Sequence, residues 1–189
     1  GPEGLNEFSR YFYPQLDKEG LIIDDRANGG GNVSPMILER LSREPYRLTM
    51  RRGSSLIGTV PDAVQVGPKV CLINKYSASD GDLFPWGFRA LGLGKLIGTR
   101  TWGGIIGPLP YMDGTDIRVP FFTSYDPKTG NWIIENHGVD PDILIDNDPI
   151  KEWNGEDQQL DRAIEEVMKQ LKERKPLAPV PAPRDWSHK

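Results

Sequence analysis

Three short apolar runs, each leading into a loop of small residues, most constrain what this chain can fold into. They are GLIIDDR (residues 20–26), PKVCLINKYS (68–77) and GKLIGTR (94–100). Continuous apolar character over so few residues is typical of strands buried on both faces. Helices are predicted between them, over residues 34–43 and 79–93. Strands that alternate with helices in this way predict an α/β fold built on a parallel sheet.

The remaining segments extend this pattern without suggesting a second domain. Apolar residues at helical spacing predict helices over residues 5–17 and 157–174. Ser34 is a good N-cap for the first internal helix. Residues 45–52 alternate as a strand, and 108–135 consist of short alternating pieces with turns. We therefore expect a sheet flanked by helices, with a small β-hairpin or meander and a C-terminal helix.

The two ends of the chain differ from the α/β domain that we expect over residues 5–175. The chain begins with Gly-Pro and without an initiator methionine, which is typical of a cleaved tag at residues 1–4 and of a fragment of a longer protein. Residues 176–189 form a proline-rich tail, with four prolines within 176–183. Such a segment favours an extended conformation, and Trp186 is its candidate anchor on a neighbouring domain or subunit.

Composition excludes several classes of function. The chain has 37% hydrophobic residues and a net charge of −4, which indicates a soluble globular protein. Its apolar runs are far shorter than the ~18–20 residues that cross a bilayer. Scattered basic residues give no footprint for nucleic acid. The single cysteine, Cys71, lies in an apolar run, which indicates a buried structural thiol and favours, weakly, a cytoplasmic location.

The first candidate for chemistry is the glycine loop DDRANGGGN (residues 24–32). It lacks the spacing of the dinucleotide-binding and P-loop motifs. Consecutive glycines can adopt positive φ and expose backbone N–H groups, as in an oxyanion hole. The same residues also suit a tight connection between a strand and a helix, and the sequence leaves both interpretations open.

The second candidate is Ser79 in the stretch YSASDGD. As an N-cap with Asp82 three residues later, it fits a variant capping box. If Asp82 is the cap instead, Pro85 falls in the first turn and Ser79 stands on a turn ahead of the helix. A serine there would lie beside free N–H groups and the positive end of the helix dipole, as a nucleophile requires. Spacing alone leaves structural and catalytic interpretations open.

The third candidate is the pair Glu135 and His137 in NWIIENHGVDPD. Glu135 ends an apolar strand, where a carboxylate lies at a solvated edge or holds a partner. His137 is one of two histidines, with His188 in the tail, and is interpreted as a surface loop residue. No cluster has the spacing of metal ligands, so we expect no metal and no cofactor.

The order LIIDDRANGGGN, INKYSASDGDLF, IGTRTWGG and ENHGVDPD resembles the C-terminal processing peptidases, a superfamily of serine peptidases. The motifs SASDGD and NHGVDPD are most similar to its tricorn protease branch. The resemblance covers roughly residues 20–175 and implies the α/β catalytic subdomain of that family, with a core similar to the Clp-protease/crotonase fold.

The resemblance also implies roles for individual residues. Ser79 matches the nucleophile, and the N–H groups of Asp80 and of Gly31 or Gly30 match the oxyanion hole. Glu135 matches the carboxylate of the tricorn charge relay. In that branch a serine–histidine pair completes the relay, and it would lie upstream of this chain. We therefore expect this chain alone to hydrolyse peptides negligibly.

Two details of the sequence bear on the identity of the base. Other processing peptidases use a lysine in the segment after the serine, but TRTWGGIIG has glycines where that lysine would fall. His137 does not fall on the catalytic position of the family, so it is not assigned a catalytic role.

The resemblance implies peptides or unfolded polypeptides as substrates, contact with upstream domains, and a possible homo-oligomer, with no nucleic-acid or membrane partner. Two alternatives remain. The same fold is used by a non-catalytic ligand- or peptide-binding module. A crotonase-like acyl-CoA enzyme would use the oxyanion hole on a thioester, but it has no use for Ser79 with Glu135.

Overall fold

A parallel sheet lies at the centre of the computed structural model, which describes residues 1–54, 56–105, 107–119, 122–175 and 177–182. In spatial order its four strands are β1 (Leu21–Asp24), β4 (Lys69–Ile73), β5 (Gly94–Gly98) and β10 (Ile143–Leu144). The first three coincide with the three apolar runs, so the predicted α/β fold is confirmed. The two-residue strand β10 was not predicted from the sequence.

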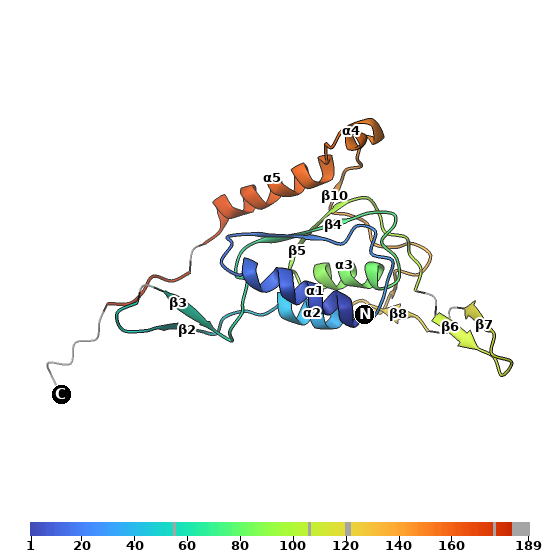
Figure 1. The fold of residues 1–189 in the computed structure, drawn as a ribbon, viewed down its shortest axis with the longest axis horizontal. Helices are drawn as coiled ribbons and strands as arrows, with labels where there is room; N and C mark the ends of the chain where they lie inside the picture. Colours follow the sequence, from blue (N-terminus) through green and yellow to red (C-terminus); the bar gives the residue numbers. More distant parts are fainter. Residues whose placement is uncertain (55, 106, 120–121, 176, 183–189) are drawn as a thin grey trace.

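Helices cover both faces of the sheet (Figure 1). One face carries α1 (Pro2–Phe12), the 3-10 helix η1 (Tyr13–Gln15), α2 (Ser34–Leu41) and α3 (Asp80–Ala90). The other carries α5 (Gln158–Glu173), which follows the short helix α4 (Pro149–Trp153). The bounds of α5 agree with the predicted amphipathic helix to within one residue at each end.

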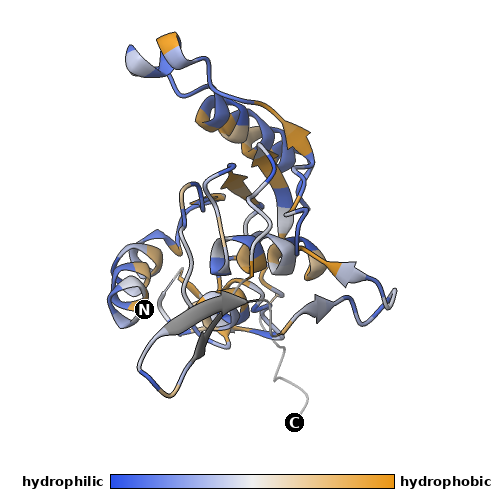
Figure 2. Ribbon diagram, turned by 90° about the vertical axis from the view of Figure 1, so that its right-hand side faces the viewer, coloured by the Kyte–Doolittle hydropathy of each residue, from blue (hydrophilic) through white to orange (hydrophobic). Residues whose placement is uncertain are grey.

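Alternate residues of β4 contribute to the two halves of the core. Cys71 and Ile73 pack in the cluster beneath α1, α2 and α3, whereas Val70 and Leu72 pack in the cluster beneath α5. Successive side chains of a strand point to opposite faces, so a strand covered on both sides must be apolar throughout. Figure 2 shows this hydrophobic character in the central strands. Burial raises the pKa of the Cys71 thiol well above its usual range, as expected for a structural cysteine.

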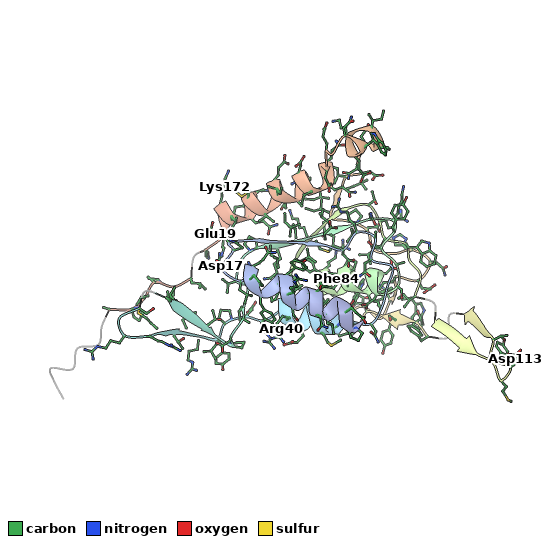
Figure 3. All side chains as sticks on the ribbon, viewed as in Figure 1. Asp17, Glu19, Arg40, Phe84, Asp113 and Lys172 are labelled. Carbon is green, nitrogen blue, oxygen red and sulfur yellow. The ribbon has the colours of Figure 1, made fainter. Side chains whose placement is uncertain are left out.

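Three antiparallel pairs lie outside the parallel sheet. They are β2 (Arg47–Met50) with β3 (Ile57–Val60), β6 (Gly107–Pro110) with β7 (Asp116–Val119), and β8 (Ser124–Tyr125) with β9 (Trp132–Ile133). The first two project from opposite ends of the molecule (Figure 1), and Figure 3 shows Asp113 at the tip of the β6–β7 turn. The hairpin predicted within residues 108–135 is therefore present, as two separate pairs. The strand predicted over 45–52 pairs with β3, not with the central sheet.

The start of α2 differs from the prediction. Ser34 is the first helical residue and Val33 is the N-cap, so the prediction of Ser34 as N-cap is wrong. The reason is that the Asp80 carboxylate accepts the backbone N–H groups of Val33 and Ser34, at 2.8 and 3.1 Å. A side chain from α3 thus satisfies the free N–H groups that open α2.

The start of α3 decides between the two alternatives in the sequence. The helix begins at Asp80 with Ser79 as its N-cap and forms the capping box with Asp82. The alternative in which Asp82 is the cap is therefore wrong, and Pro85 lies inside the helix. Because proline has no N–H, it removes the helical hydrogen bond to the carbonyl of Gly81.

The two glycines that make α3 a poor helix lie where neighbouring elements approach closely. A Cβ atom at Gly81 would collide with the carbonyl oxygen of Asn28 in the glycine loop. A Cβ atom at Gly87 would lie 2.5 Å from Cδ1 of Leu38 in α2. The low helix propensity of this segment is therefore tied to the packing of α3 against α2 and the glycine loop.

The ends of the chain add little regular structure. Helix α1 begins at Pro2, within the segment 1–4 that was interpreted as a tag remnant. Residues 177–182 contain no helix or strand, and Trp186 lies outside the described residues. Within the described ranges, no helix is long and apolar enough to cross a membrane.

Phe88 tests the core beneath α3, because its side chain is fully buried. Replacing Phe88 by Ala should lower the free energy of unfolding by about 3–5 kcal/mol, since the lost transfer energy adds to the cost of a cavity. Leu91→Ala, at the exposed end of the same helix, should cost less than about 1 kcal/mol. Urea unfolding measures both, and equal losses would contradict this description of the core.

Candidate active site

Ser79 lies on a strained turn between β4 and α3. Its backbone has φ 57° and ψ −113°, a conformation that residues with a Cβ rarely adopt. Its N–H group donates to the carbonyl of Gly104 at 3.1 Å and to the Asp82 carboxylate at 2.8 Å. Backbone strain of this kind is held by surrounding bonds and clusters at functional sites.

The other serine of the stretch, Ser77, has a structural role. It is fully buried, and its hydroxyl donates to the carbonyl of Asp25 at 2.8 Å, which joins the ends of β4 and β1. Of the two serines, only Ser79 lies at the start of α3 and lines a groove.

The glycine loop lies directly against Ser79. A Cβ atom at Gly30 would be 2.8 Å from the Cβ of Ser79, so only glycine fits at this position. Gly30 and Gly31 both have positive φ, at 117° and 149°. The N–H of Gly30 donates to Oδ1 of Asn28 at 3.0 Å, whereas that of Gly31 donates to no group among the described residues. The sequence left open which of the two glycines supplies a free donor, and this geometry favours Gly31.

Asp80 contributes both a free N–H group and a structural side chain. As the first residue of α3, its N–H has no acceptor among the described residues, which is usual at a helix start. Its carboxylate is buried and accepts the N–H groups of Val33 and Ser34 at the start of α2, which is a structural role. Asp80 follows Ser79 in the chain, and Gly31 lines the same groove as both. Two N–H donors beside a serine can stabilise an oxyanion.

Residues 103–105, after β5, join the Ser79 turn to Glu135. The Asp82 carboxylate is fully buried and accepts the N–H groups of Gly103 and Gly104, at 2.8 and 3.2 Å. The next N–H, of Ile105, donates to the Glu135 carboxylate at 2.9 Å. Because the Gly104 carbonyl also accepts from Ser79, one short segment fixes both predicted site residues.

Glu135 lies on a second strained turn. The residues on either side of it, Ile134 and Asn136, have positive φ of 72° and 62°. For a β-branched residue such as Ile134, this conformation is a genuine outlier. The Asn136 N–H donates to the Gly103 carbonyl at 2.8 Å, which holds the turn against residues 103–105. Strain thus occurs at both ends of the link between Ser79 and Glu135.

The backbone of His137 lies against Gly103, but its side chain makes no hydrogen bond to Ser79 or Glu135. Its Nε2 atom is 2.6 Å from the Asp140 carboxylate, which also pairs with Arg100, and all three side chains are more than half exposed. The hydrogen bond from His137, together with these charges, lowers the pKa of Asp140. In the described part of the chain, no histidine or lysine side chain hydrogen-bonds to Ser79, and no three His, Cys, Asp or Glu residues group as metal ligands.

A groove of about 730 Å³ runs from Ser79 between α2 and α3. Gly31 and Asp80 line it beside the serine, and the rest of its lining is mainly apolar, including Leu38, Leu83, Trp86 and Ile105. An apolar groove with a few polar groups at one end is the usual form of a substrate site.

Asp25, behind the glycine loop, is the most perturbed acid of the site. Burial raises its pKa to about 8, although the hydrogen bond from Asn28 opposes this and nearby acidic residues add to it. Its second oxygen, Oδ2, is buried and has no hydrogen-bond partner in the part of the chain that the structure describes. With a pKa of about 8, this carboxyl group is mostly protonated at pH 7.

Several residues of this arrangement were not predicted from the sequence, namely Asp25, Asn28 and the segment 103–105. The two glycines at 103–104 could have indicated a close approach of the backbone to another segment. In the sequence they were interpreted only as evidence that no lysine base lies there. Asp82 was predicted as the partner of Ser79 in a capping box, and its carboxylate does accept the Ser79 N–H. Its bonds to residues 103 and 104 depend on contacts that the sequence does not reveal.

Replacing Asp25 by Asn should remove a pH dependence from the stability. Unfolded Asp25 ionises near its usual value of 3.8, whereas the folded group stays protonated to about pH 8. As the pH rises from about 5 to about 8, wild type should therefore lose stability relative to Asp25→Asn, by up to about 1.4 kcal/mol per pH unit. Urea unfolding across this range measures the gap, with the exposed Asp17→Asn as control. A gap that stays constant would show that Asp25 is ionised in the folded protein.

Comparison with known proteins identifies the relatives of this chain. Residues 2–145 match the model described as Peptidase family S41. The chain is 41% identical over 175 residues to the Tricorn protease of Thermoplasma acidophilum, and 37% identical over 173 residues to Tricorn protease homolog 1 of Streptomyces coelicolor. These matches cover 91% and 90% of this chain but only 16% of each relative, so the chain spans about a sixth of their length.

Solved structures agree with these relatives. The crystal structure of the tricorn protease matches with a TM-score of 0.82 and 40% identity, over 91% of this chain and 17% of that one. Mature CPAF complexed with lactacystin shares the fold, with a TM-score of 0.66 at 17% identity, over 92% of this chain and 49% of that one. The predicted resemblance is confirmed, and this chain belongs to peptidase family S41.

Proposed function

We propose that this chain is the catalytic subdomain of a tricorn-like serine peptidase, with Ser79 as the nucleophile. The observation that carries the proposal is the strained backbone of Ser79, in one groove with Gly31 and Asp80, whose N–H groups have no acceptor among the described residues. Serine peptidases need an exposed hydroxyl beside donors that bind a developing oxyanion. The family to which the chain belongs supports the same assignment.

In the proposed reaction, Ser79 Oγ attacks the carbonyl carbon of a peptide bond while a base takes its proton. The negative charge moves to the carbonyl oxygen, which accepts hydrogen bonds from the N–H groups of Gly31 and Asp80. The start of α3 adds the positive end of a helix dipole. Collapse of this intermediate expels the amine, which takes the proton from the base, and water then hydrolyses the acyl-enzyme by the same route.

The base is proposed to come from a part of the protein outside this chain, because no histidine or lysine among the described residues bonds to Ser79. Glu135 would orient that base, as a third group orients the base in other serine enzymes. Its position supports this role, because the Ile105 N–H donates to one carboxylate oxygen, and the other accepts no hydrogen bond from the described residues. The substrates proposed are peptides or unfolded polypeptides.

The strained turns argue against the alternative of a non-catalytic binding module. Positive φ at Ser79 and on both sides of Glu135 costs stability, and a binding module has no need of that cost. A crotonase-like acyl-CoA enzyme would use the two N–H donors, but its reaction has no role for Glu135 and so gives no reason for the strained backbone on either side of it.

Fluorophosphonate labelling tests the nucleophile. In the longer protein that supplies a base, Ser79 should carry the adduct, and Ser79→Ala should abolish both labelling and peptide hydrolysis. The present chain alone should label at least about a hundredfold more slowly, because an unactivated serine is a weak nucleophile. Ser9→Ala, on the exposed face of α1, is the matched control. Labelling of another residue, or none under conditions where a known serine peptidase labels, would favour the binding module.

The groove should select for apolar side chains. Trp86→Ala removes a large part of its lining, so kcat/KM for peptides with a large apolar residue near the scissile bond should fall about tenfold or more. Peptides with alanine there should be affected less. Trp153→Ala, on the exposed helix α4, is the control. An equal fall for both classes of peptide would mean that this groove does not bind the substrate side chain.

A further inference from the structure

Asn28 connects the glycine loop to the Ser79 turn through both its backbone and its side chain. Its carbonyl oxygen accepts the N–H of Ala78, the residue before Ser79, at 2.8 Å. Its side-chain oxygen accepts the N–H of Gly30 at 3.0 Å. The carbonyl also faces Gly81, whose missing Cβ leaves room for it. One residue thus contacts the chain on both sides of the proposed nucleophile and the loop that carries the proposed oxyanion donor.

Asp25 fixes which way the Asn28 amide points. Its Oδ1 atom accepts from Nδ2 of Asn28 at 2.9 Å, which turns the amide oxygen toward Gly30. A flipped amide would direct its NH2 group at the Gly30 N–H, and two donors would then face each other. Asp25 itself is held at the end of β1, where its carbonyl accepts the buried Ser77 hydroxyl.

We propose that Asn28 is a positioning residue of this active site, oriented by Asp25, which holds the glycine loop in place for transition-state stabilisation. The proposal rests on the proposed function, because it concerns the loop that presents the Gly31 N–H. With Gly30 anchored by Asn28, the N–H of Gly31 is left free beside Ser79. Without the anchor, three successive glycines have many alternative conformations, and the donor would lose its fixed position.

The charge of Asp25 adds a second effect. The acidic groups that act on it are Asp24 on β1 and Asp80 and Asp82 on α3, and the thiol of Cys71 on β4 lies close enough to be affected by it. Ionisation of Asp25, with a pKa of about 8, would place another negative charge behind the loop. That charge opposes an oxyanion, so the rate should fall as Asp25 ionises.

The test uses the full-length protein, fluorophosphonate labelling of Ser79 and peptide hydrolysis. Asn28→Ala should lower kcat and the labelling rate about tenfold or more, with KM changed less than about twofold, because an oxyanion forms only in the transition state. Asn28→Ser, which keeps a shorter acceptor for the loop, should lie between wild type and Asn28→Ala. If Asn28→Ala does not fold, Asn28→Ser takes its place in the test, and its kcat should be lower than that of wild type.

Asp25→Asn is the conservative variant, because an amide oxygen can still accept from Asn28 without ionising. Its rate near neutral pH should stay within about threefold of wild type, since the orienting hydrogen bond remains. Above about pH 8 the rate of wild type should fall and that of Asp25→Asn should not, since only wild type gains a charge. Asp17→Asn, an exposed carboxylate that is not among the groups acting on Asp25, should keep the wild-type profile. Identical profiles for wild type and Asp25→Asn would overturn the role of Asp25.

Crystal structures of wild type and Asn28→Ala separate this inference from the proposed function. A glycine loop that moves in the variant supports positioning by Asn28, and a loop that stays in place overturns it. The crystal structures show whether the loop moves even if Ser79 is never labelled. The absence of labelling would overturn the proposed function. If Ser79 labels and Asn28→Ala keeps the wild-type kcat, the proposed function stands and the positioning role fails.

Discussion

The buried carboxylate of Asp82 is the interaction on which the site depends. It accepts three backbone N–H groups, from Ser79, Gly103 and Gly104. A buried carboxylate is stable only when hydrogen-bond donors replace the water that it has lost. Here the donors lie on the Ser79 turn and on residues 103–104, two segments that neither a helix nor a sheet joins. Asp82, the third residue of α3, therefore also fixes the segment after β5, and the Ile105 N–H in that segment donates to Glu135.

A second buried carboxylate, that of Asp80, holds backbone segments together on the other side of Ser79. Asp80 accepts the N–H groups that open α2, so the starts of α2 and α3 are held together. The glycine loop lies between these two helix starts. Two acids separated by a single glycine in the sequence thus organise opposite sides of one serine. The helix that carries them tolerates Gly81 and Gly87 because close neighbours require them.

Much of the fold followed from local patterns. The three apolar runs became β1, β4 and β5, because a strand with helices on both faces must be apolar at every position. The hairpin β2–β3 was only half predicted, since residues 57–60 carry no clear alternation. The cap of α2 was assigned to Ser34, the nearest polar side chain, because nothing local signals that Asp80, 46 residues later, would accept the N–H of Ser34.

The sequence by itself determined the α/β class, the serine turn at a helix start and the glycine loop, because each depends on neighbouring residues and their backbone preferences. Tertiary structure decided which N–H groups remain free, which of Gly30 and Gly31 is anchored, and how Ser79 is linked to Glu135. These depend on hydrogen bonds between residues far apart in the chain. Only the parallel pairing of β1, β4 and β5 brings the loops at their carboxyl ends together, where those bonds can form.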